Sequence, residues 1–139
     1  MMKNSKEILS SLLKTTQMGQ VGIRSVLDTS MRPGLRKALE SQLHEYDSIE
    51  TEAHSIATQR GWEVPELDPA VRFMSDMSVR MRLNGRDTDS KIAGMMIQGN
   101  TRGMIKGLKY NGQDVQVGTL SQKLLDCETA NIRQMQNYL

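Results

Sequence analysis

The chain has 139 residues, of which 37% are hydrophobic and 11 are methionine, with one cysteine and a net charge of +2. This composition predicts one domain with an aliphatic, methionine-filled core, and it excludes wholesale disorder, an internal disulfide framework and a cysteine-based zinc site. The balanced charge gives no reason to expect a nucleic-acid ligand. No apolar run reaches the roughly 20 residues that cross a membrane, and the N-terminal segment does not resemble a secretion signal.

Apolar residues recur at helical spacing along the sequence, and no segment alternates apolar and polar residues as a strand does. The spacing and the turn residues predict helices at about 5–29, 33–60, 69–84, 88–111 and 114–138, all in one domain over 1–139. In the second helix, an apolar stripe with heptad spacing begins at Leu35 and predicts a seam for neighbouring helices. Pro33 suits the first turn of this helix and Gly61 suits its end.

The lengths of the connections predict the topology. The first two helices are joined by a short loop and are expected to be antiparallel, as are the last two. About 25 residues, including the short helix, separate the second helix from the fourth, so the connector can return along the bundle. We therefore predict an all-α, ferritin-like four-helix bundle whose long crossover carries a short extra helix and buries Trp62 and Phe73.

Short motifs in three of the helices are similar to those of a known family. They are Pro33 with Leu35-Arg36, Leu39, Gln42-Leu43 and Gly61-Trp62, then Ile97-Gln98-Gly99-Asn100 with Gly103, and finally Glu128-Thr129-Ala130-Asn131-Ile132. Together they resemble the spore coat protein F family over about residues 5–139. The resemblance implies a ferritin-like bundle from a spore-forming bacterium that serves as a coat component. The chain departs from the family pattern at Arg32, where serine is usual, and at Glu63, where an aromatic residue is common.

A ferritin-like fold makes a dinuclear metal site the first enzymatic hypothesis. Such a site needs a glutamate from each of two helices and a Glu-x-x-His motif from each of the other two. Residues 90–113 contain no acid, the first helix carries acids only near its ends, and Asn131 stands where a histidine would have to follow Glu128. We therefore expect no catalytic residue, no cofactor and no metal. Any relic of a metal site is expected at Glu45, Glu128 and Asn131.

Other reactive or polar residues have ordinary structural interpretations. His44 and His54 each follow a glutamate by four residues, which is typical of a metal clip or, as we favour, of contacts on a solvated face. Cys127 is expected to be a buried structural thiol. Gln42 and Glu128 fall on apolar stripes, so they either lie at the rim of the seam or meet inside the bundle as a polar layer.

Small residues and uneven charge indicate close contacts and self-association. Gly99, Gly103 and Gly107 recur every four residues, so another backbone can approach there, either within the chain or from another subunit. Residues 36–68 are mainly acidic and residues 72–109 mainly basic. We expect a homodimer or an assembly with other coat proteins, and no nucleic-acid or membrane partner.

The sequence favours a non-catalytic structural or interaction protein that is cytoplasmic or deposited in a spore coat. One alternative is a degenerate or active ferritin-like protein with an oxidative di-metal site. A second alternative is a small-ligand or nucleic-acid binding module. The small number of inward carboxylates favours the first hypothesis over the enzymatic one.

Overall fold

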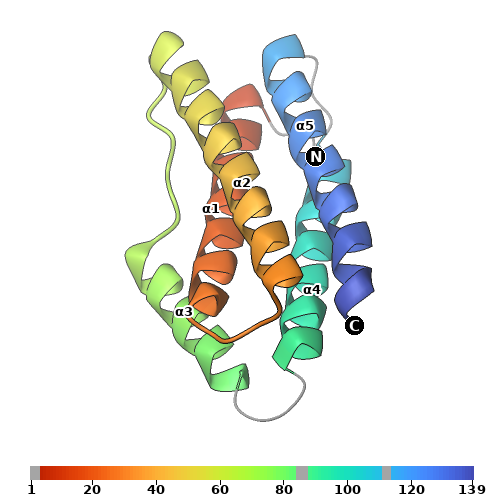
Figure 1. The fold of residues 1–139 in the computed structure, drawn as a ribbon. Helices are drawn as coiled ribbons and strands as arrows, with labels where there is room; N and C mark the ends of the chain where they lie inside the picture. The colour runs from red at the N-terminus through yellow and green to blue at the C-terminus, as the bar shows by residue number, and fades with distance from the viewer. Residues whose placement is uncertain (1–3, 84–87, 111–113) are drawn as a thin grey trace.

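The computed structural model describes residues 4–83, 88–110 and 114–139. Over these residues the chain is helical and contains no strand, which confirms the predicted all-α class. The elements are α1 (Ser5–Leu27), α2 (Pro33–Gln59), α3 (Pro69–Arg82), α4 (Thr88–Leu108), α5 (Val115–Met135) and a short 3-10 helix, η1 (Gln136–Tyr138) (Figure 1). The helix ends predicted at 84 and 111 fall outside the described residues.

Local capping explains where the helices begin and end. The side chains of Asn4, Asp68 and Asp114 accept hydrogen bonds from backbone N–H groups in the first turns of α1, α3 and α5. At the end of α2, Gly61 has a positive φ of 65°, and the next backbone N–H, from Trp62, donates to the carbonyl of Ala57 at 2.8 Å. This is a Schellman motif, in which glycine is favoured because a Cβ would be strained.

The four long helices form two antiparallel pairs. α1 and α2 make one pair, α4 and α5 the other, and the pairs join where α2 packs on α5 and α1 packs on α4. Between α2 and α4 the chain returns along the bundle, first as an extended segment at 60–68 and then as α3 (Figure 1). α2 and α4 consequently run in the same direction. α3 packs chiefly against α1 and lies outside the four long helices.

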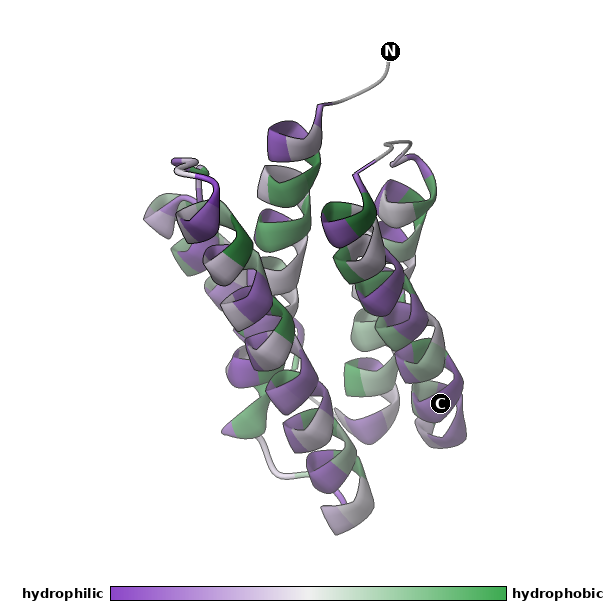
Figure 2. Ribbon diagram, turned by 90° about the horizontal axis from the view of Figure 1, so that it is seen from above, coloured by the Kyte–Doolittle hydropathy of each residue, from purple (hydrophilic) through white to green (hydrophobic). Residues whose placement is uncertain are grey.

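Leucine and isoleucine fill the core between these helices. The largest fully buried apolar side chains are Leu9, Leu12, Leu13, Ile23, Leu35, Leu39, Ile49, Ile92, Leu120 and Met135. Hydrophobic and hydrophilic residues are interleaved along each helix (Figure 2), so one side of each long helix can face the core. Of the methionines that the structure describes, only Met96 and Met135 are buried. The prediction of a methionine-filled core was therefore wrong.

The connector buries one of the two aromatic residues that were expected to be covered. Trp62 is half-buried against the core, and the guanidinium of Arg60 lies 4.9 Å from its ring centroid. Phe73 is 64% exposed, so the prediction that it packs against the bundle was wrong. The reason lies in how α3 is attached: Val79 packs against the core, and Ser25 Oγ of α1 donates to Asp76 Oδ1 at 2.5 Å. These contacts turn Phe73 towards solvent.

Candidate functional site

A buried glutamate lies at the centre of the bundle. Glu128 of α5 is 2% exposed, and its Oε1 accepts a hydrogen bond of 3.0 Å from the hydroxyl of Tyr46 on α2. Its other oxygen, Oε2, is buried and has no hydrogen-bond partner among the described residues. Burial raises the pKa of Glu128 to about 8, although the Tyr46 hydrogen bond opposes this shift. The carboxyl is therefore mainly protonated and uncharged at neutral pH.

Two glycines make room for this hydrogen-bonded pair. A Cβ added at Gly103 of α4 would lie 3.0 Å from Glu128 Oε1, and one added at Gly19 of α1 would lie 2.8 Å from the ring of Tyr46. Each side chain thus packs directly on the backbone of a neighbouring helix. The Tyr46–Glu128 pair therefore joins α2 to α5 and is enclosed by α1 and α4.

The predicted glycine stripe is divided between inner and outer surfaces. Gly103 faces Glu128, and a Cβ at Gly107 would meet Leu125 of α5 at 3.5 Å, an ordinary contact distance. A Cβ at Gly99 would have no described atom within 4 Å beyond its own helix backbone and chain neighbours. Two of the three glycines therefore face α5 within the chain, and the third does not.

The thiol of Cys127 connects the other two predicted relic residues. Its Sγ donates to Glu45 Oε2 at 2.8 Å, and Asn131 Nδ2 donates to the same sulfur at 3.5 Å. Burial and the neighbouring Glu45 carboxylate both raise the pKa of Cys127 well above its usual range. The sulfur therefore stays a neutral thiol, which is a poor nucleophile and a poor metal ligand.

The structure thus places Glu45, Glu128 and Asn131 at the interface of α2 and α5, in one polar cluster in which Asn131 contacts both Cys127 and Tyr46. Cys127 links Glu45 to Asn131, whereas Tyr46 binds Glu128. Tyr46 and Cys127 were not among the predicted site residues. The sequence feature that could have identified them is adjacency, because Tyr46 follows Glu45 and Cys127 precedes Glu128.

The second polar residue on an apolar stripe has its own partner. Gln42 is buried, and its Nε2 donates to Gln134 Oε1 of α5 at 3.2 Å. Gln42 and Glu128 therefore both lie inside the bundle, but no hydrogen bond among the described residues joins them. Each is a local polar contact between α2 and α5.

Both histidines lie on the exposed side of α2. His54 Nε2 is 2.8 Å from Glu66 Oε1 on the connector, a contact that the sequence did not indicate. The buried Gln17 of α1 donates to Glu66 at 3.2 Å and accepts the backbone N–H of Leu67 at 2.8 Å. These contacts attach the connector to α1 and α2. Within the described residues, no group of three or more His, Cys, Asp or Glu is placed to hold a metal ion.

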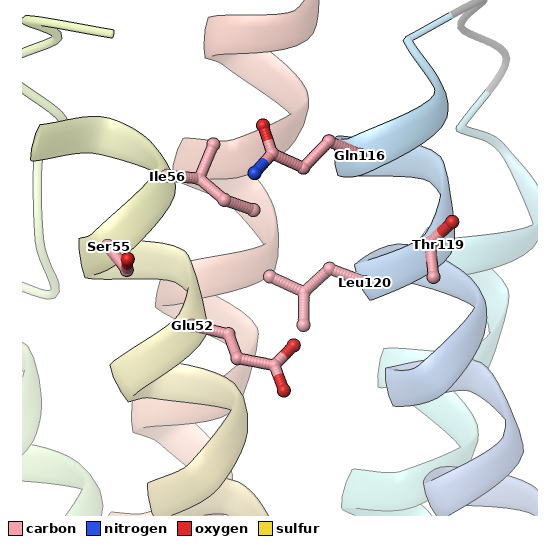
Figure 3. A pocket seen from close by; sticks show the side chains of 6 residues that line it. All are labelled: Glu52, Ser55, Ile56, Gln116, Thr119 and Leu120. Atoms are coloured by element: carbon pink, nitrogen blue, oxygen red, sulfur yellow. The ribbon is translucent and has the colours of Figure 1, made fainter. Parts of the chain in front are cut away.

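A shallow groove of about 440 Å³ lies between α2 and α5, near the end of α2 (Figure 3). Its lining consists of Glu52, Ser55, Ile56, Gln116, Thr119 and Leu120. Ile56 and Leu120 are buried and form its floor, while Lys123 Nζ lies 2.8 Å from Glu52 Oε1 at its edge. The groove offers an apolar floor with a polar rim, on which the only carboxylate among its lining residues, that of Glu52, is paired with Lys123.

An exposed apolar surface covers the outer side of α3. We call it the α3 face, and it consists of Val71, Phe73, Met74, Met77 and Met81, which are exposed by 41, 64, 70, 45 and 68%. In α3, all of which the structure describes, no residue is buried. Half of the ten large hydrophobic side chains found exposed in the described chain belong to this face. Five exposed apolar side chains on one helix make this face a candidate interaction site.

Comparison with protein-family models, curated proteins and solved structures finds no match to this chain. Among the described residues, no helix is both long enough and apolar enough to cross a membrane. The candidate sites are identified by geometry alone, and they are the buried Tyr46–Glu128 pair and the α3 face.

Proposed function

We propose that this protein is a non-catalytic structural or interaction protein on a ferritin-like helical bundle, comparable to a spore coat component. The observation that carries the proposal is the α3 face. No residue of α3 is buried, and although Val79 packs against the core, α3 turns Met74, Met77 and Met81 outward. Methionine side chains are flexible and polarisable, so they adapt to the surface of a protein partner.

The buried centre supports the non-catalytic part of the proposal. A dinuclear metal centre needs several ionised carboxylates to offset two dications, together with histidine ligands. At the interface of α2 and α5, Glu128 is held uncharged by burial and is hydrogen-bonded to Tyr46. The packing of these side chains on Gly19 and Gly103 also fills the space beside them. The pair fits the role of a structural contact between helices.

Elemental analysis of the purified protein tests the non-catalytic part. After exhaustive dialysis, we expect no stoichiometric iron, manganese or zinc, and no ferroxidase activity when ferrous iron is added. One or more metal ions per chain would overturn this part of the proposal and favour the alternative of a ferritin-like metal protein.

Localisation in sporulating cells tests the structural part. We expect the protein to pass from the mother-cell cytoplasm into the coat fraction, and the Met74→Lys/Met81→Lys variant to lose this location. Both methionines are exposed, so their replacement leaves the folded chain intact. The matched control is Leu108→Lys/Val115→Lys, which replaces two equally exposed residues away from α3. Equal distribution of both variants and the wild type in the cytoplasm would contradict the coat assignment.

A further inference from the structure

We propose that the α3 face is covered by a second copy of this chain, with α3 of each copy packed antiparallel against the other about a twofold axis. The inference rests on the proposed interaction function and names its partner. The occupied surface is the outer side of α3, so the second copy approaches the bundle from the side opposite α4 and α5 (Figure 1).

Three apolar residues of the face have the spacing of a helix-packing seam. Val71, Met74 and Met81 are separated by three and seven residues, as at the a and d positions of paired helices. Ser78 stands at the remaining a position, and Met77 lies next to it. At 1.5 Å per residue, the seam runs about 15 Å along α3, which is two turns or more of continuous contact.

Contacts with α1 hold α3 in place before any partner binds. Ser25 donates to Asp76 at 2.5 Å, and Arg80 lies 3.2 Å from Asp28 and 3.1 Å from Asp76. These polar contacts fix the rotation of α3, so the face is presented in an ordered form. Binding therefore has a smaller entropic cost than it would on a mobile segment.

The exposed area is sufficient for a small symmetric interface. The five exposed fractions correspond to roughly 500 Å² of side-chain surface per copy, and a symmetric pair buries roughly 1,000 Å², the lower bound for a specific interface. The surface at the centre of the face is methionine and phenylalanine, which are residue types enriched in interface cores. The expected dimer is therefore weak to moderate in affinity and depends on concentration.

The charges at the two ends of α3 favour the antiparallel arrangement. The exposed Asp68 caps the start of the helix, and the exposed Arg82 lies in its last turn. Their neighbours Glu66 and Arg80 already form ion pairs within the chain. An antiparallel pair places the acidic end of one copy beside the basic end of the other, and it does so twice because the contact is symmetric. A parallel pair would place like charges together. The face is thus complementary to itself.

Sedimentation velocity from micromolar to near-millimolar concentrations tests the self-association. We expect a reversible dimer for the wild type and dimerisation weakened by roughly 10,000-fold for Met74→Lys/Met81→Lys, because the symmetric contact loses four buried methionines and each contributes about tenfold to affinity. Leu108→Lys/Val115→Lys, the matched control, should dimerise like the wild type. A wild type that stays monomeric, or a control that dissociates equally, would overturn the inference.

Cysteine cross-linking tests the orientation. In an antiparallel pair centred near Met77, Met77→Cys meets its own copy and forms a disulfide under mild oxidation. Val71→Cys is the control on the same face, because its two copies would be separated by roughly 20 Å along the helices, too far for a disulfide. Cys127 is buried, so the wild type reports the background. Cross-linking of Val71→Cys in preference to Met77→Cys would contradict the antiparallel arrangement.

The two proposals fail in different ways. A monomeric wild type whose coat location still depends on α3 would reject the second copy as the partner and keep the interaction function. A dimer that carries stoichiometric metal would keep the α3 pairing and reject the non-catalytic function.

Discussion

Replacing Glu128 with glutamine should stabilise the protein and remove much of the pH dependence of its stability. Glutamine has nearly the same shape, and its Oε1 can still accept the hydrogen bond that Tyr46 donates at 3.0 Å. Its amide nitrogen takes the place of Oε2, which has no hydrogen-bond partner among the described residues in the wild type. The variant therefore removes the ionisation of the site, and its unpaired amide hydrogens add a cost that does not change with pH.

The size of the effect follows from the pKa of Glu128, which burial raises from 4.5 to about 8. Between these values the unfolded chain releases a proton that the folded chain retains, so stability falls as the pH rises. The contribution is complete below pH 4.5 and is lost as the pH passes through about 8. At 1.36 kcal/mol per unit, the full loss is on the order of 5 kcal/mol.

Urea unfolding followed by helical circular dichroism between pH 5 and 9 provides the assay. We expect the advantage of Glu128→Gln over the wild type to grow by about 1.4 kcal/mol per pH unit up to pH 8 and then to level off. Glu40→Gln, which removes an exposed carboxylate from α2, should follow the wild-type curve. A constant difference between Glu128→Gln and the wild type across this range would refute the assignment of a protonated Glu128 to the core.

Two further predictions concern the surroundings of this pair. Gly103→Ala should lower the free energy of unfolding by about 1–3 kcal/mol, because its Cβ would lie 3.0 Å from Glu128 Oε1. Gly107→Ala has ordinary space around its Cβ and should be neutral or stabilising, and chemical denaturation of the two variants tests the difference. Cys127 should resist labelling by a thiol reagent in the folded protein and react rapidly in urea, because burial and Glu45 raise the pKa of its thiol in the folded state. Rapid labelling of the native chain would contradict the contact between Cys127 and Glu45.

Periodicity and caps in the sequence were sufficient to locate the helices. In α2, the apolar stripe that begins at Leu35 keeps the heptad spacing over the whole helix, and Gly61 supplies the backbone conformation that ends it. The length of the connector indicated that the chain can return along the bundle between α2 and α4, and the chain does so (Figure 1). These features depend on neighbours in the sequence, which is why they can be predicted without the tertiary structure.

The orientation of α3 could not be predicted in the same way. An apolar stripe shows that a helix has a face to cover, but not which partner covers it. The orientation of α3 is set by contacts between residues distant in sequence, such as the hydrogen bond between Ser25 and Asp76 and the packing of Val79 against the core. Because these contacts occupy the inner side of α3, Phe73 and Met74 are left outside, contrary to the prediction for Phe73.

The polar centre was predicted in part. A glutamate on an apolar stripe indicated that Glu128 would need a partner, because burying an ionisable group without one is costly. Which residue serves as this partner depends on the axial register of α2 against α5, and no local sequence pattern specifies that register. Tyr46 lies on the apolar stripe of α2 that begins at Leu35, yet its hydroxyl provides the hydrogen bond to Glu128. The role of Gly103 follows from the same packing.

The two candidate sites place opposite demands on the molecule. The Tyr46–Glu128 pair packs on glycine backbones with no spare room, so the centre of the bundle is specific and rigid. The α3 face consists largely of flexible methionines outside the packed core, so its shape can adjust to a partner without changing that core. Adaptation at a surface is useful to a protein that binds others. At the centre, by contrast, burial keeps the Glu128 carboxyl uncharged, so the core does not have to hold an unpaired charge.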